Sequence, residues 1–158
     1  MTKLYFASPL FSEMEQQFNA ALVQRIREAY PHIEVYLPQE QADINDKNAY
    51  ANSTLIAKID TEHLLSSQLL IAILDGSSID VGVASEIGVA YQAGIPILAL
   101  YSDVRQQGAT NAQKIAALQE VAESQFAYIN LYTVGLIKLN GEIVTSSSTL
   151  IEHIKNYI

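Results

Sequence analysis

Residues 69–74 form an unbroken apolar run, Leu-Leu-Ile-Ala-Ile-Leu, which constrains the fold more than any other part of the chain. Such a run is typical of a strand buried on both faces, as in a parallel sheet covered by helices on either side. Three carboxylates and several glycines follow in segment 75–88, where a helix is expected to begin. Ligands of open α/β sheets bind at the carboxyl ends of the strands, so this segment also predicts a binding site.

Short apolar runs and amphipathic stretches alternate along most of the chain. Ser12 and Glu15 form a capping-box pattern ahead of apolar residues at helical spacing, and Gly94 stands where a helix would end. This alternation predicts an α/β fold with a doubly wound, flavodoxin-like or Rossmann-like parallel sheet flanked by helices. Strands are expected at 3–7, 33–37, 69–74 and 95–100, and helices at 12–29, from Ser53 to about 66, 81–93 and 112–124.

Two segments depart from this alternation. Residues 38–52 are polar and too long for a routine connection, which is typical of a functional loop. Near the end of the chain, Asn140-Gly141 lies between two apolar runs within 136–144, which predicts a small C-terminal hairpin. A last helix is expected to start at Ser147 or Ser148.

The composition narrows the class of protein. A length of 158 residues with 49% hydrophobic residues suits one domain, 1–158, with a full core. The chain has no cysteine and its three histidines lie far apart, so we expect no metal and no thiol chemistry. A net charge of −8 with scattered Lys and Arg argues against a nucleic-acid polymer as partner. No apolar run approaches the ~18 residues of a membrane span, and the N-terminus lacks a secretory pattern, so a soluble cytoplasmic protein is expected.

Glu86 is the strongest candidate for chemistry. It lies four residues after Gly82, so on a helix both share one face, and its neighbours are small and apolar. An isolated carboxylate is costly in such surroundings, which favours a functional site over a solvated helix residue. The nearby helix N-terminus is expected to help keep Glu86 ionised, as a nucleophile or a base needs.

Other polar residues have two readings each. Asp80 is either a helix N-cap or part of the site, and Tyr5 is either a core aromatic or a site residue at the end of its strand. Asp60 interrupts an apolar helix face and is either an ordinary exposed carboxylate or part of the site, and Asn130 suits either a turn or contact with a ligand or second subunit. The Gly-rich patterns of dinucleotide and nucleoside triphosphate sites and the Gly-x-Ser-x-Gly elbow are absent.

Five segments occur in a characteristic order along the chain: Leu4–Phe11, Asp60 eight positions before Gln68, Leu74–Gly76, Asp80–Gly88 and Ile129–Leu131. Together they resemble the nucleoside 2-deoxyribosyltransferases, and Asp-x-Gly-x-x-x-Glu-x-Gly is the most specific match. That family has a five-stranded parallel sheet. The resemblance implies a double displacement at the anomeric carbon of a 2-deoxyribonucleoside, with no cofactor.

The resemblance also implies roles. Glu86 would be the nucleophile that forms a deoxyribosyl ester, Tyr5 would orient it, and Asp80 would contact the base and help deliver a proton to it. Asp60 would bind the deoxyribose hydroxyls, and Phe11 would pack on the base. Asn130 would reach the sugar 5′-hydroxyl of a neighbouring subunit, which implies dimers or hexamers with shared sites. Apart from the resemblance, an apolar wall near Gly82 or Ala84 is expected to exclude ribose, and a residue among 39–41 is expected to contact the base.

Two alternatives stay open. A deoxynucleoside 5′-monophosphate N-glycosidase would use the same type of glutamate, but it needs a phosphate cradle, and the loop 7–12 contains neither glycine nor arginine. A non-catalytic nucleoside-binding module would keep the fold without turnover. Exchange of bases between deoxynucleosides, in nucleobase salvage, is the preferred hypothesis.

Overall fold

The computed structural model describes residues 1–41, 52–106, 110–117, 119–122 and 129–158. Five strands form one sheet in the order β2-β1-β3-β4-β5, and every neighbouring pair is parallel. The predicted doubly wound α/β fold is therefore confirmed, and its strand order reverses direction between β1 and β3, where ligands of this architecture bind. The strands are β1 (Lys3–Ala7), β2 (Glu34–Tyr36), β3 (Leu69–Ile73), β4 (Ile97–Leu100) and β5 (Gly141–Val144).

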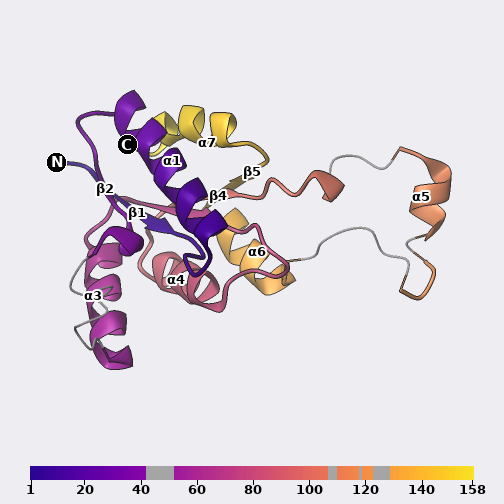
Figure 1. Ribbon diagram of the computed structural model, residues 1–158, viewed down its shortest axis with the longest axis horizontal. Helices are drawn as coiled ribbons and strands as arrows, with labels where there is room; N and C mark the ends of the chain where they lie inside the picture. Colours follow the sequence, from indigo (N-terminus) through magenta and orange to yellow (C-terminus); the bar gives the residue numbers. More distant parts are fainter. Residues whose placement is uncertain (42–51, 107–109, 118, 123–128) are drawn as a thin grey trace.

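Helices cover both faces of the sheet (Figure 1). Helices α1 (Glu13–Ala29) and α7 (Ser147–His153) pack on one face, and α3 (Ser53–Leu65), α4 (Val81–Gln92) and α6 (Leu131–Leu139) pack on the other. Side chains of β1 alternate between these layers, so Leu4 and Phe6 join the α1 and α7 core while Tyr5 joins the α3 and α4 core. This alternation directs Tyr5 toward the helix that carries Glu86.

Local sequence signals account for several helix boundaries. Ser12 and Glu15 form the predicted capping box at the start of α1, and Gly94, with a φ of 72°, follows the end of α4. The N-cap of α3 is Asn52 and that of α7 is Ser146, each one residue before the serine expected to start the helix. Short 3-10 helices span Pro38–Glu40, Val104–Gln106 and Ile154–Asn156.

The predicted C-terminal hairpin is wrong. Residues 131–139 form α6, and β5 pairs parallel with β4, so no antiparallel turn exists at Asn140-Gly141. Asn140 instead caps the end of α6 and donates from its side chain to the Ile95 carbonyl at 2.7 Å. A Cβ on Gly141 would lie 1.8 Å from the Ile97 oxygen, so this glycine permits close approach of two parallel strands.

Two other expectations are met only in part. Helix α5 spans Ala112–Ala117, and residues 119–122 form turns, so this helix is shorter than the 112–124 predicted. Helix α5 lies away from the sheet in Figure 1. Most of the predicted long polar loop, residues 42–51, lies outside the described residues, as do 118, 123 and 124 of the predicted helix. In the part of the chain that the structure describes, no helix is long and apolar enough to cross a membrane.

Candidate active site

A cavity of about 300 Å³ lies where β1 and the start of α4 meet α3. Five of the seven site residues predicted from the sequence border it, so the structure brings together residues that are up to 75 positions apart: Phe11, Asp60, Asp80, Gly82 and Glu86. The remaining lining residues are Ser8, Leu10, Pro38, Ile56 and Val83. Three carboxylates therefore face a cavity whose described lining contains no lysine or arginine.

Glu86 is held by Tyr5. The Tyr5 hydroxyl donates to Glu86 Oε1 at 2.6 Å, and Tyr5 itself is fully buried. Burial and the negative charge of Glu86 both raise the pKa of Tyr5 above its ordinary value, so the phenol stays protonated and remains a donor. Tyr5, a sixth residue predicted for the site, is thus connected to it through its hydrogen bond to Glu86.

Burial changes the protonation of Glu86. It raises the pKa of Glu86 to about 7; the hydrogen bond from Tyr5 opposes this effect, and the charges of Asp60 and Asp80 add to it. The helix N-terminus was expected to help keep Glu86 ionised, and burial acts in the opposite direction. Glu86 lies in the second turn of α4, where the dipole field has already weakened.

Asp80 is the N-cap of α4 and also lies at the cavity. Its Oδ1 accepts hydrogen bonds from the backbone N–H groups of Gly82 at 2.9 Å and Val83 at 3.1 Å, so it is the N-cap of α4. The same residue borders the cavity. A Cβ on Gly82 would lie 2.9 Å from Asp80 Oδ1, so the missing side chain makes room for the capping carboxylate.

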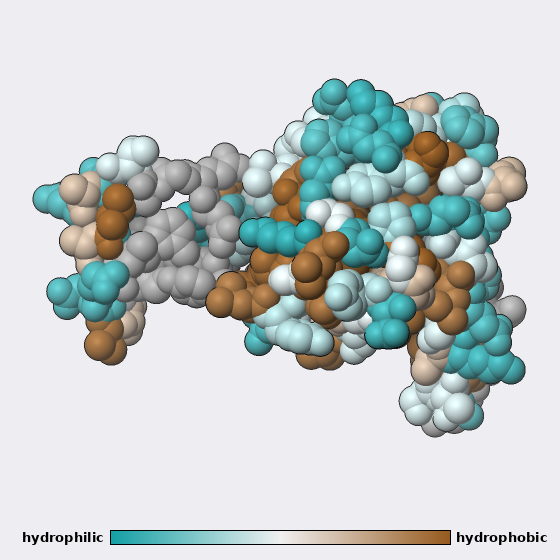
Figure 2. Space-filling model, turned by 180° about the vertical axis from the view of Figure 1, so that it is seen from behind, coloured by the Kyte–Doolittle hydropathy of each residue, from teal (hydrophilic) through white to brown (hydrophobic). Residues whose placement is uncertain are grey.

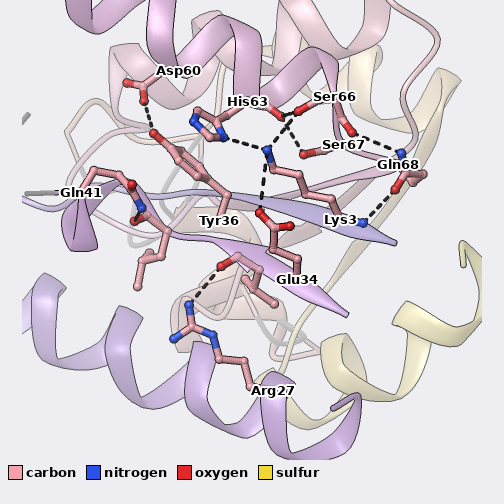
Figure 3. A network of polar contacts seen from close by, with 12 residues as sticks. Lys3, Arg27, Glu34, Tyr36, Gln41, Asp60, His63, Ser66, Ser67 and Gln68 are labelled. Carbon is pink, nitrogen blue, oxygen red and sulfur yellow. Dashed lines mark hydrogen bonds and ion pairs between the residues drawn. The ribbon is translucent and has the colours of Figure 1, made fainter. Parts of the chain in front are cut away.

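Asp60 is fixed by a residue that sequence reasoning missed. The Tyr36 hydroxyl donates to Asp60 Oδ1 at 3.1 Å (Figure 3), and the Tyr36 ring stacks on Tyr5 with ring centroids 5.2 Å apart. Burial raises the pKa of Asp60, while the Tyr36 hydrogen bond and His63 oppose this effect. The parallel pairing places Tyr36 directly beside Tyr5, a relation that no local motif reveals.

The remaining predicted residues lie at the edge or outside. The Phe11 side chain borders the cavity and is 80% exposed. Asn130 does not border the cavity; it is the N-cap of α6 and accepts a hydrogen bond from the Tyr132 N–H at 2.9 Å. Gln39 and Glu40 contact α1 instead of the cavity, through Asn19 and Arg27 respectively. Among the residues described, no cluster of three or more His, Cys, Asp or Glu could hold a metal ion.

Comparisons with known proteins identify the family. The family model for nucleoside 2-deoxyribosyltransferase matches residues 4–141. The chain belongs to the nucleoside 2-deoxyribosyltransferase family. The matched range contains all seven predicted site residues and the whole of strands β2, β3 and β4.

Solved structures agree with this assignment. A conserved protein from Enterococcus faecalis V583 is 61% identical over 100% of this chain and 99% of that chain, with a TM-score of 0.94. A 2-deoxyribosyltransferase from Leishmania mexicana has a TM-score of 0.68 at 16% identity, covering 100% of both chains. The CMP N-glycosidase BcmB from Clostridium botulinum has a TM-score of 0.53 at 16% identity, covering 99% of this chain and 100% of that one. No curated protein sequence matches the chain. The fold and family are those of a nucleoside deoxyribosyltransferase-like enzyme.

Proposed function

We propose that this enzyme transfers 2-deoxyribose from one nucleobase to another by double displacement through a glutamyl-deoxyribosyl intermediate. The observation that carries the proposal is the Glu86 carboxylate, which borders the cavity and is oriented by a 2.6 Å hydrogen bond from Tyr5. A buried carboxylate held by a neutral phenol is suited to attack a carbon that develops positive charge.

In the first half-reaction, ionised Glu86 attacks C1′ of the nucleoside on the side opposite the base. An ester bond forms between Glu86 and C1′ while the bond from C1′ to the base nitrogen breaks, and its electron pair leaves with the base. A proton taken up from water is passed to that nitrogen by Asp80, at the start of α4. The transition state resembles an oxocarbenium ion, which the nearby carboxylates stabilise.

In the second half-reaction, a second base attacks C1′ from the side that the first base left. The ester bond breaks, its electron pair returns to Glu86, and the proton of the incoming base returns to Asp80. Water in place of the base gives slow hydrolysis.

The other roles are part of the same proposal. Phe11, exposed beside the cavity, would pack on the base; Asp60, on the cavity wall, would accept hydrogen bonds from deoxyribose hydroxyls, and the wall at Gly82 would exclude ribose. Asn130 would complete the site of a second subunit in a homo-oligomer. Helix α6, which Asn130 caps, exposes Leu131, Tyr132 and Leu139 by 84%, 76% and 72%, and Figure 2 shows hydrophobic patches between hydrophilic areas on one face of the molecule. Nucleobase salvage in the cytoplasm is the proposed setting.

A 5′-monophosphate N-glycosidase is the second candidate, because the fold is shared with a CMP N-glycosidase. The described lining of the cavity favours a nucleoside, since it contains three carboxylates and no lysine or arginine to bind a phosphate.

The test is incubation of the purified protein with deoxyinosine and adenine, and separately with deoxyinosine alone, followed by chromatography. Deoxyadenosine forming faster than free deoxyribose supports base exchange, and Glu86→Ala should abolish it while the protein stays folded. Deoxyribose alone, or faster turnover of deoxyinosine monophosphate than of deoxyinosine, would identify a hydrolase. No turnover of purine or pyrimidine donors would identify a binding module.

A further inference from the structure

Tyr36 lies between the candidate catalytic residues and a network of polar side chains at the start of β1. It ends β2, is 4% exposed, and faces the layer that contains α3 and α4. Its hydroxyl donates to Asp60, and its ring stacks on two others: Tyr5, and the His63 imidazole with centroids 3.9 Å apart and planes 14° apart. One side chain thus contacts both the Asp60 carboxylate and the phenol that orients Glu86.

His63 is fixed in turn by Lys3. Lys3 Nζ lies 2.7 Å from His63 Nδ1 and donates to Ser66 Oγ at 3.0 Å (Figure 3). An ammonium group has donors and no acceptor, so Nδ1 must be the acceptor and the ring proton lies on Nε2. Burial and the Lys3 charge lower the pKa of His63, which favours the same neutral ring. Tyr36 therefore packs against an uncharged imidazole of one tautomer.

Asp60 depends on Tyr36 for its orientation. In the described part of the chain, the Tyr36 hydroxyl is the one group that donates a hydrogen bond to this carboxylate. Asp60 borders the cavity and is partly buried, so a carboxylate without that donor would rotate toward solvent or take up a proton. The hydroxyl and the ring of Tyr36 act on different parts of the site, because the hydroxyl holds Asp60 and the ring supports Tyr5.

We infer that Tyr36 is a positioning residue of this site: its hydroxyl holds the Asp60 carboxylate for the sugar, and its ring holds Tyr5 against Glu86. Lys3 and His63 keep Tyr36 in place. The inference rests on the proposed function as far as Asp60 is assigned to the sugar. It extends that function to a residue that does not itself touch the substrate.

Tyr36→Phe is the informative change, because it removes the hydroxyl and keeps the stacked ring. Tyr30→Phe is the matched control: the Tyr30 hydroxyl donates to the Ile151 carbonyl at 2.7 Å, on the α1 and α7 side of the sheet. We expect Tyr36→Phe to raise KM for deoxyinosine about tenfold and to change kcat less than about threefold, since a hydrogen bond to a charged group is lost. Tyr30→Phe should leave both constants unchanged. Equal effects of the two substitutions would overturn the inference.

A double-mutant cycle separates positioning from general damage. In an Asp60→Ala background the Tyr36 hydroxyl has no carboxylate to hold, so Tyr36→Phe should then change KM less than about twofold. A full tenfold effect in that background would show that Tyr36 does not act through Asp60.

A measurement without turnover distinguishes this inference from the proposed function. Carbon-13 NMR titration of the carboxyl groups reports Asp60 directly, and the titratable groups that act on it are Tyr36 on β2, Tyr5 on β1, His63 on α3 and Glu86 on α4. Tyr36→Phe should raise the pKa of Asp60, because the lost hydrogen bond favours the charged form. If the wild-type protein exchanges no bases but Asp60 shifts in this way, the function fails and the positioning role stands. If the wild-type protein exchanges bases and Tyr36→Phe leaves the pKa of Asp60 unchanged, the positioning role is refuted and the proposed function stands.

Discussion

Replacing Tyr5 by phenylalanine tests how the site controls its nucleophile. The substitution keeps the ring that stacks on Tyr36 and removes the hydroxyl that donates to Glu86 at 2.6 Å. That hydrogen bond stabilises the ionised carboxylate, so its loss must raise the pKa of Glu86. The attacking form of Glu86 is then scarcer at neutral pH.

The size of the effect follows from the wild-type value. With a pKa of about 7, Glu86 is ionised in about half of the free enzyme at pH 7. A hydrogen bond to a charged group contributes roughly 1.5 kcal/mol, which is about tenfold in the acid constant. Tyr5→Phe should therefore lower kcat/KM about fivefold at pH 7 and about tenfold well below it, with no loss at alkaline pH.

The assay is the pH profile of kcat/KM for base exchange between pH 5 and 9, with Tyr30→Phe as the control. The wild-type profile should rise with pH to a plateau with its midpoint near 7, and the Tyr5→Phe profile should rise at higher pH. A uniform loss of rate with an unmoved midpoint would refute the reasoning, because Tyr5 would then act on something other than the ionisation of Glu86.

Three further predictions concern stability. The folded-state pKa of Glu86 is raised above that of an unfolded glutamate, so ionisation of Glu86 destabilises the fold as pH rises from about 4.5 to about 7. Glu86→Gln should therefore increase the free energy of unfolding at pH 8 by on the order of 2 kcal/mol, allowing for screening. The substitution should have no such effect at pH 4, and urea titration at both pH values measures the difference. Asp80→Ala removes the α4 cap and should cost about 1 kcal/mol by thermal unfolding, whereas Asp80→Asn should keep most of that stability, and equal losses would contradict the capping role. Gly141→Ala should lower the free energy of unfolding by about 3 kcal/mol, because the added Cβ would overlap the Ile97 oxygen. Gly135→Ala in α6 should raise it by about 0.5–1 kcal/mol, because the added Cβ would meet no atom within 4 Å. Similar urea midpoints for the two variants would contradict the structure.

The fold was predictable where periodicity is local. The apolar run before Asp75 and the capping box at Ser12 each specify one element without reference to the rest of the chain, and both elements form as predicted. The hairpin prediction at Asn140-Gly141 was wrong because the conformation of these residues depends on β4, which is far away in sequence. The same two residues that commonly make a hairpin turn here end a helix and admit a parallel neighbour.

In the candidate site, too, features set by local sequence were predictable and features set by distant contacts were not. Glu86, Asp80 and Gly82 lie in one short segment, so their spacing on a helix was enough to bring them together. The pKa of Glu86 was not predictable, because burial is a property of everything packed around it. Tyr36 gave no signal because it is one residue of a three-residue strand, and only the register between β1 and β2 places it beside Tyr5.

The alternation of Leu4, Tyr5, Phe6 and Ala7 along β1 has a practical consequence for redesign. The side-chain hydrogen bonds from Tyr5 to Glu86 and from Tyr36 to Asp60 lie on the α3 and α4 face of the sheet, while the opposite face is packed mainly by apolar side chains, including those of α1 and α7. An engineer can therefore vary the α1 and α7 layer to raise the melting temperature with little effect on turnover. Substitutions in the α3 and α4 layer would have the opposite effect, because they would alter substrate range before the melting temperature.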